Sequence, residues 1–323
     1  MTRSIIMSKT GGPDVLKVKH VEVGVPIDNQ IKIRQTFAGV NFHDCYVRSG
    51  SYKTLELPGT PGLEAVGTVE AIGPKVTKFK EGDRIGYVSR QYGGYSESRI
   101  IDENIPVLLP NTIDDRTAAA TLLRGLTAQM LTHKVFPIQP EQTVLIHAVA
   151  GGVGRLLCQW AKYLGARVIG TVGNKEKGNI ALKDGCDEVI YYREERFVDR
   201  VHDITEGSGV DVVYDSVGQD TFLDSIKCLA PRGHLANFGQ SSGAIDPFSI
   251  SLLFEKSNSV SRAAVFHYFQ GENKLPMAET LFSALENGVI KSEDPHVYSF
   301  ENAPLAHADL ESRKTNGAVL LKI

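Results

Sequence analysis

A glycine-rich turn near the middle of the chain has the residue types that bind phosphate groups. Strand-forming residues run from Val144 into this turn, where Ala148, Gly151 and Gly154 are spaced three residues apart. Glycine lets the backbone approach a pyrophosphate closely, and the first N–H groups of a following helix attract its negative charge. The spacing departs from the G-x-G-x-x-G pattern, so a tight structural turn is the alternative, but the flanking elements favour dinucleotide binding.

Those flanking residues supply the strand, helix and second strand that a dinucleotide-binding unit needs. The segment after the turn ends at Gly165, and its apolar face consists of Leu156, Leu157, Trp160 and Leu164. Strands are predicted over 166–172, 187–192, 210–215 and 233–238, and helices over 174–184, 197–207 and 221–229. This alternation with short links predicts a doubly wound parallel sheet, covered on both faces, from Arg124 to about Phe266.

The first part of the chain has the pattern of a compact β-rich domain. Residues 30–38 and 65–72 alternate between apolar and polar side chains, which predicts strands, and the glycine and proline residues between them predict turns. Near the C-terminus, two helix candidates (274–287 and 301–312) precede a strand-like segment, 318–323, and we expect this tail to return to the first domain. The prediction is a first domain of residues 1–123 and 267–323, with residues 124–266 inserted into it and a cleft between the two.

The overall composition fits a globular enzyme with two domains. The chain has 323 residues, of which 42% are hydrophobic and 23% charged, and a net charge of −3 gives no long-range attraction to nucleic acid or anionic membranes. Its four cysteines are widely scattered and indicate neither a disulfide framework nor a zinc knuckle. Such cysteines favour a reducing cytoplasm as the location. The sequence shows neither a signal peptide nor a run of about 18 apolar residues that could span a membrane.

Short motifs follow one another in a characteristic order over nearly the whole chain. They are GGPDVL at 11–16, GVNFHDCYVRSG at 39–50, PGLEAVGTV at 61–69, EGDRI at 81–85, GGYSE at 93–97, YDSVG at 214–218 and FGQSSG at 238–243. Together they resemble the zinc-free, zeta-crystallin-like NADPH:quinone oxidoreductases of the medium-chain dehydrogenase/reductase superfamily. The resemblance implies a Rossmann domain inserted into a GroES-like catalytic domain, NADPH as cofactor, a quinone as substrate, and a homodimer paired through a strand near 257–265.

The zinc ligands of related enzymes are replaced in this chain. Zinc alcohol dehydrogenases of the superfamily resemble G-V-C-x-x-D and P-G-H-E, and here Asn41 and Leu63 stand in place of the ligating cysteine and histidine. A neutral amide and an alkyl group cannot replace a thiolate and an imidazole on zinc. The nearby His43, Cys45 and Glu64 could be remnants of a metal site, but we favour a buried, hydrogen-bonded trio. The prediction is a metal-free enzyme for a substrate that accepts electrons easily.

Lysines begin the helix after the second strand of the predicted sheet, where NAD-binding folds usually carry an acid that holds the ribose. Residues 171–174 contain no acid, and Glu176 is flanked by Lys175 and Lys177. The positive charge of the two lysines suits the 2′-phosphate of NADPH. The alternative is that the lysines only form a solvated face of the helix. The resemblance implies that Lys177, Tyr192 and Arg313 contact that phosphate.

The resemblance also implies which residues surround the reacting groups. Asn41, Tyr46 and Thr127 would line the nicotinamide, and Tyr52 and Arg262 would contact quinone oxygens. Arg262 would act like an oxyanion hole, with an interface salt bridge as the alternative. Tyr46 is either a proton donor or a packed ring, because an unperturbed phenol titrates near about 10. The predicted catalytic residues are Asn41, Tyr46, Tyr52 and Arg262. The predicted cofactor-binding residues are Asn41, Tyr46, Thr127, Gly151, Gly152, Val153, Gly173, Lys177, Tyr192, Ser216, Phe238, Gly239, Ser241, Val265 and Arg313.

Two other functions stay open at this point. With the same cofactor, the substrate could be an α,β-unsaturated aldehyde or ketone, reduced at its double bond. Some proteins that resemble this family bind RNA or serve as structural proteins of the lens, but the acidic balance and the lack of a basic aromatic patch disfavour RNA binding. The sequence leaves both one-electron and two-electron transfer open.

Overall fold

Six strands in the middle of the chain form one parallel sheet in the computed structural model, which describes residues 1–292 and 295–323. They are β8 (Thr143–Ile146), β9 (Arg167–Val172), β10 (Glu188–Tyr191), β11 (Val210–Asp215), β12 (Leu229–Asn237) and β13 (Ser259–Arg262). The order in the sheet is β10-β9-β8-β11-β12-β13, and every neighbouring pair is parallel. This order reverses between β8 and β11, as in a Rossmann sheet, so the predicted fold class is confirmed.

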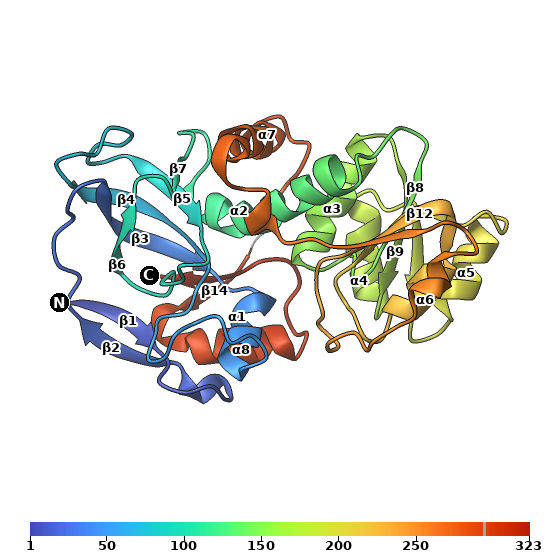
Figure 1. The fold of residues 1–323 in the computed structure, drawn as a ribbon, viewed down its shortest axis with the longest axis horizontal. Helices are drawn as coiled ribbons and strands as arrows, with labels where there is room; N and C mark the ends of the chain where they lie inside the picture. Colours follow the sequence, from blue (N-terminus) through green and yellow to red (C-terminus); the bar gives the residue numbers. More distant parts are fainter. Residues whose placement is uncertain (293–294) are drawn as a thin grey trace. The chain divides into compact units, whose positions relative to one another are not determined.

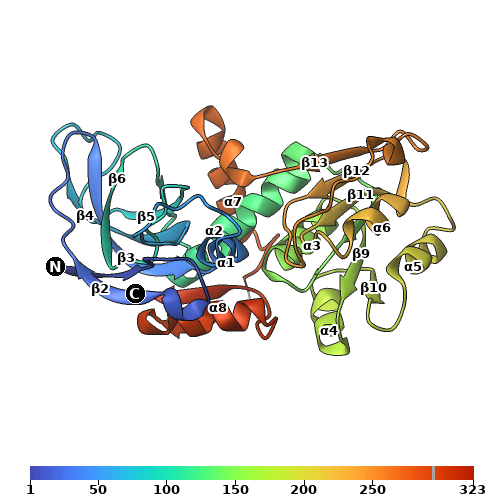
Figure 2. The ribbon, with the colours of Figure 1, turned by 60° about the horizontal axis from the view of Figure 1, so that its bottom comes forward.

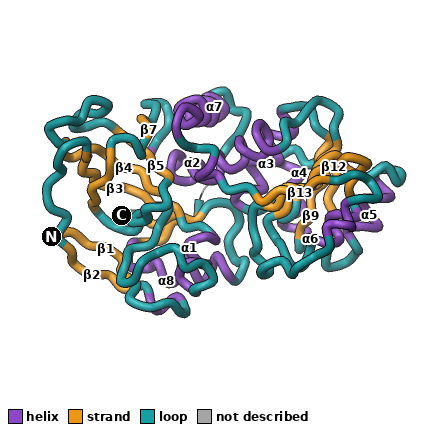
Figure 3. The backbone as a smooth tube through the Cα atoms, viewed as in Figure 1, coloured by secondary structure: helices purple, strands orange, loops and turns teal. Residues whose placement is uncertain are grey.

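Helices connect these strands and lie on either side of the sheet (Figure 3). They are α3 (Gly152–Tyr163), α4 (Lys175–Lys183), α5 (Phe197–Ile204) and α6 (Phe222–Lys227). Val201 of α5 and Ile226 of α6 belong to one buried apolar cluster with Leu145 and Val213 of the sheet. Strand β11 is buried at every residue except Asp211, as expected for a parallel strand covered on both faces.

A second sheet, mostly antiparallel, forms from the first part of the chain and the C-terminal tail. Its strands are β3 (Gln30–Gly39), β4 (Glu64–Ile72), β5 (Arg84–Val88), β6 (Ser98–Asp102), β7 (Val107–Leu108), β14 (His296–Ser299) and β15 (Val319–Lys322). Strand β15 pairs with β3, so the predicted return of the last strand to the first domain is confirmed. The strands β1 (Thr2–Ile6) and β2 (Lys17–Val21) form a separate pair, and both chain termini lie in this part of the molecule (Figure 1).

Helix α1 (Phe42–Ser49) follows β3 directly and carries several predicted site residues. It begins after Asn41, whose backbone N–H donates to Asp44 Oδ2 at 2.9 Å, and it ends at Gly50, whose φ is 91°. Helix α8 (Ala303–Glu311) lies beside α1 in two views (Figures 1 and 2). Helix α8 was predicted from the sequence, and α1 was not.

The chain divides into two units, and the division differs from the predicted one in one segment. Unit 1 consists of Met1–Leu123 and Ser292–Ile323, and unit 2 of Arg124–Lys291. Residues 267–291, which were predicted to belong to the first domain, cluster with unit 2. The reason is helix α7 (Lys274–Glu286), whose Leu281 packs so closely on Gly125 that an added Cβ there would lie 2.4 Å from the leucine.

The remaining elements are one long helix and several single turns. Helix α2 (Asp115–Met130) continues into a π-helical turn, η2 (Leu131–Val135). Short 3-10 turns are η1 (Pro13–Val15), η3 (Ile250–Leu253), η4 (Val265–His267), η5 (Gly271–Asn273) and η6 (Phe300–Asn302). None of the helices in the described part of the chain has both the length and the apolar character needed to cross a membrane.

Candidate active site

The glycine turn joins β8 to α3 at the point where the strand order reverses. The Gly151 N–H donates to the Ala148 carbonyl at 2.8 Å, and Ala148 itself has a φ of 52°. A Cβ on Gly154 would lie 2.4 Å from that same carbonyl oxygen, so the turn requires glycine at this position. Within the described residues, α3 has no acid in its first turn and no side chain caps it. Its first N–H groups, which include Gly152 and Val153, are therefore suited to binding an anion.

A buried histidine, His147, supports this turn and was not predicted from the sequence. His147 Nδ1 lies 3.0 Å from Thr171 Oγ1, and its Nε2 lies 2.9 Å from Ser225 Oγ. Burial lowers the pKa of His147, with Asp215 acting in the opposite direction, so the ring is neutral at pH 7. Thr171 Oγ1 also accepts the Ala148 N–H at 3.3 Å, which ties the turn to β9. A histidine at the end of an otherwise apolar strand was the available signal.

Two of the three predicted phosphate contacts gather at the end of β9. Asn174 Oδ1 accepts the Lys177 N–H at 2.9 Å, which places Lys177 in the first turn of α4. A Cβ on Gly173 would lie 2.8 Å from the Tyr192 hydroxyl oxygen, so Tyr192 covers this glycine. Arg313 is in unit 1, where it is exposed and follows α8 with a φ of 60°.

The loops after β11 and β12 bring several predicted residues together. The Ser241 N–H donates to the Ser216 carbonyl at 3.2 Å, and a Cβ on Gly239 would lie 2.5 Å from the same oxygen. Arg262 Nη1 donates to the Gly239 carbonyl at 2.7 Å, and its Nη2 donates to Gln240 Oε1 at 3.2 Å. The half-buried Phe238 begins this loop, Val265 is buried in η4, and the half-buried Thr127 lies in α2.

In unit 1, half-buried aromatic rings gather around helix α1. The rings of Tyr46 and Tyr52 have centroids 5.1 Å apart, and the His43 ring lies at the same distance from Tyr52. His43 Nε2 lies 3.1 Å from the hydroxyl oxygen of Tyr92. Burial, with the nearby Arg90 charge, lowers the pKa of His43 to about 4, so this histidine is uncharged at pH 7. The predicted residues Tyr46 and Tyr52 are thus in contact with each other.

The residues at the superfamily's zinc-ligand positions do not fit a zinc ion. Leu63 is buried and has no donor atom, and Asn41 Nδ2 donates to Glu64 Oε1 at 2.8 Å. Cys45 Sγ lies 3.5 Å from His307 Nδ1, and burial raises the pKa of this thiol. Each member of the suspected trio thus has a different partner, and no group of three or more histidine, cysteine or acidic residues within 1–292 and 295–323 has the arrangement of a metal site.

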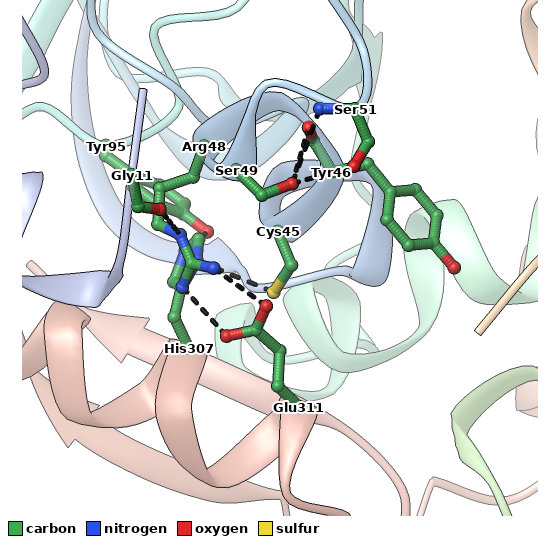
Figure 4. A network of polar contacts seen from close by, with 9 residues as sticks. All are labelled: Gly11, Cys45, Tyr46, Arg48, Ser49, Ser51, Tyr95, His307 and Glu311. Atoms are coloured by element: carbon green, nitrogen blue, oxygen red, sulfur yellow. Dashed lines mark hydrogen bonds and ion pairs between the residues drawn. The ribbon is translucent and has the colours of Figure 1, made fainter. Parts of the chain in front are cut away.

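A polar network that is buried except at Glu311 joins α1 to α8 (Figure 4). Arg48 pairs with both carboxylate oxygens of Glu311, at 2.8 and 2.7 Å, while His307 Nε2 lies 3.0 Å from the Tyr95 hydroxyl oxygen. Burial, with the Arg48 charge, lowers the pKa of His307 to about 3. The Tyr46 ring points away from this network in Figure 4. The network therefore anchors α1 on one side while Tyr46 projects from the other.

The Rossmann sheet and the glycine turn define a dinucleotide-binding α/β protein. Residues 27–111 match the family described as alcohol dehydrogenase GroES-like domain, and residues 152–282 match the family described as zinc-binding dehydrogenase. The chain is 42% identical to quinone oxidoreductase 1 of Escherichia coli and 38% identical to 2-haloacrylate reductase of a Burkholderia species, in each case over 99% of both chains. A solved E. coli quinone oxidoreductase, in complex with NADPH, matches with a TM-score of 0.96 and 42% identity over 100% of both chains. The chain therefore belongs to the quinone oxidoreductase family of the medium-chain dehydrogenase/reductase superfamily.

Proposed function

We propose that this protein is an NADPH-dependent quinone oxidoreductase. The observation that carries the proposal is the glycine turn at the reversal point of the sheet, in a chain whose relative from E. coli is solved with NADPH. Steady-state oxidation of NADPH, with and without para-benzoquinone, tests the proposal. Quinone-dependent consumption of NADPH supports it, and no consumption at high enzyme concentration contradicts it.

The residues of unit 2 fit the cofactor. Gly152 and Val153 offer backbone N–H groups to the pyrophosphate at the positive end of α3, and Gly151 leaves room for it. Lys177 and Tyr192 are assigned to the 2′-phosphate. We assign the rest of the cofactor surface to Thr127, Gly173, Ser216, Phe238, Gly239, Ser241 and Val265, with Arg313 of unit 1 as a further phosphate contact.

When bound, NADPH supplies the reducing electrons, and the protein orients the partners. In unit 1, Asn41 and Tyr46 line the nicotinamide, and the adjoining Tyr52 ring contacts the quinone. Flat aromatic rings suit a flat quinone, because offset stacking stabilises such pairs. In unit 2, the bonds of Arg262 to Gly239 and Gln240 fix its guanidinium, whose charge stabilises negative charge that develops on a quinone oxygen.

The second candidate function is reduction of an activated carbon–carbon double bond. The full-length similarity to a 2-haloacrylate reductase favours it. Both reactions need NADPH as the reductant and an electron-poor acceptor, so the same cofactor site serves either. The relative turnover of quinones and enones separates them.

We expect the purified protein to contain no stoichiometric zinc and to keep its full activity after chelation. Asn41 is bonded to Glu64 and Leu63 offers only an alkyl group, so two of the superfamily's ligand positions provide no suitable atom for zinc. Elemental analysis before and after chelator treatment, with activity measured in parallel, gives the answer. About one zinc per chain, lost together with activity, would show that the metal-free assignment is wrong.

We propose that two chains associate through the edge strand β13. In the described residues β13 pairs only with β12, so its other edge is open to a second copy. Just before this strand lie the exposed side chains of Ile250 and Phe254, which are 72% and 86% accessible. Sedimentation at micromolar concentration should give a dimer, and Phe254→Asp should shift it toward monomer. A monomeric wild type contradicts this arrangement.

We also propose that the two units are the functional domains, GroES-like for unit 1 and Rossmann for unit 2. The family matches support this division, since one falls within each unit.

We propose a cytoplasmic location, which the four buried, unpaired cysteines support because a reducing compartment keeps thiols free. Cell fractionation with an antibody to the protein checks the location.

A further inference from the structure

Glu64 is a buried acid that the proposed reaction does not yet use. It is the first residue of β4, and only 1% of its surface is accessible. Its Oε1 accepts the Asn41 Nδ2–H at 2.8 Å, and its Oε2 accepts the backbone N–H of Leu123 at 2.9 Å. Each carboxylate oxygen thus holds a donor from a different part of unit 1, and Asn41 is the one that the proposed function places beside the nicotinamide.

We propose that Glu64 is a positioning residue that fixes which end of the Asn41 amide faces the reacting groups; this inference rests on the proposed function. Both oxygens of Glu64 accept hydrogen bonds, so the NH2 group of Asn41 is the end that turns toward it. The amide oxygen Oδ1 of Asn41 therefore faces away from Glu64. Without such a partner the two ends of an amide are nearly interchangeable in shape. Glu64 makes Asn41 present an acceptor, which can bind the carboxamide N–H of the cofactor or a hydroxyl of the reduced product.

The strand opposite β4 leaves room for this carboxylate. Strands β3 and β4 are antiparallel with Ala38 opposite Ala65, which brings Gly39 opposite Glu64. A Cβ on Gly39 would lie 2.0 Å from Glu64 Oε1 and 2.5 Å from its Cδ. Glycine at this position is thus a requirement of space, and Gly39, Leu123 and Asn41 together determine where the carboxylate lies.

Glu64→Gln should reverse the Asn41 amide while keeping the size of the side chain. The Leu123 N–H is a fixed backbone donor, so the glutamine turns its oxygen toward it and its NH2 toward Asn41. Asn41 must then turn its oxygen inward and present NH2. We expect kcat to fall by about 10- to 100-fold, as when a buried donor loses its acceptor and is left unsatisfied. Glu70→Gln on the same strand, an exposed acid paired with Lys32, is the matched control and should keep wild-type kinetics.

Exchanging the two polar groups separates positioning from a merely structural role. In the double variant Asn41→Asp/Glu64→Gln, the new aspartate accepts from the glutamine NH2 and again presents an oxygen. Its kcat should exceed that of Glu64→Gln by at least about tenfold. Asn41→Asp alone should be poor, because it places two carboxylates within hydrogen-bond distance of each other. Gly39→Ala should resemble Glu64→Gln, since the added methyl displaces the carboxylate.

A measurement independent of turnover completes the test. In protein labelled with 15N-asparagine, the Asn41 side-chain NH2 signal, identified by its loss in Asn41→Asp, should shift in Glu64→Gln and stay in place in Glu70→Gln. Wild-type kcat in Glu64→Gln, or no recovery in the double variant, overturns the positioning role. If the wild-type protein does not reduce quinones with NADPH, the proposed function fails by itself. In that case the Asn41 NH2 signal still tests the hydrogen bond between Glu64 and Asn41. A shifted signal in Glu64→Gln supports this hydrogen bond, and an unshifted signal overturns it.

Discussion

The purified protein should reduce para-benzoquinone with NADPH at least about a hundred times more efficiently, as kcat/KM, than it reduces acetaldehyde or benzaldehyde. Reduction of a simple carbonyl places negative charge on one oxygen, and a bound metal ion stabilises that charge by several kcal/mol. In this chain the two positions that bind zinc in related alcohol dehydrogenases hold the buried Leu63 and the hydrogen-bonded Asn41. A quinone spreads the charge over its own conjugated system, so it depends far less on a Lewis acid. Orientation by the protein is then enough for a fast reaction.

The measurement is a panel of quinones, enones and simple aldehydes at one fixed NADPH concentration. The aldehydes are the control for general carbonyl reductase activity, and enones such as 2-alkenals represent the second candidate function. Turnover of an enone equal to or above that of the best quinone would favour double-bond reduction. If the kcat/KM for aldehydes were close to that for quinones, the site would polarise carbonyl groups through a residue or ion that we have not assigned.

The elements that local sequence determines were predictable. The strands of the Rossmann sheet are short apolar runs bounded by turn residues, and Gly165 and Gly185 have the left-handed φ values, 86° and 96°, that mark helix ends. Helix α1 was missed because its sequence, FHDCYVRS, is poor in strong helix formers. Its stability comes from the cap at Asn41 and from Arg48, which pairs with Glu311 on α8 near the other end of the chain. Such a contact has no signal in the local sequence.

In the candidate site, too, local sequence patterns were predictable and contacts between distant residues were not. The glycine turn and the lysines of α4 are local patterns and were predictable. The hydrogen bond between Asn41 and Glu64 depends on the register of β3 and β4, which places residues 39 and 64 opposite each other. The sequence could suggest that Glu64 was buried and hydrogen bonded, but only the register identifies its partner. Likewise, the side chain of Leu281 packs on Gly125, and this distant contact moves helix α7 into unit 2.

Lys177→Ala should raise the KM for NADPH by about tenfold and leave the KM for NADH nearly unchanged. Lys177 lies in the first turn of α4, where its ammonium and the positive end of the helix both favour an anion. A hydrogen bond to a charged group contributes roughly 1.5–3 kcal/mol, and we take the low end because the neighbouring Asn174 and Lys175 are exposed to solvent. NADH has no 2′-phosphate, so it loses nothing when the lysine is removed. Saturating NADPH should restore most of the turnover, because this phosphate is remote from the nicotinamide.

Steady-state kinetics with both cofactors, at low and high salt, measure the effect and its screening. Lys183→Ala, which removes a lysine from the last turn of the same helix, is the matched control and should leave both KM values unchanged. Tyr192→Phe and Arg313→Ala should also raise the KM for NADPH if their side chains bind the same phosphate. The lysine would be only a solvated helix face if the variant lost equal efficiency with NADPH and NADH. The same conclusion would follow if the wild type used both cofactors equally well, because a working phosphate site must produce a preference for the cofactor that carries the phosphate.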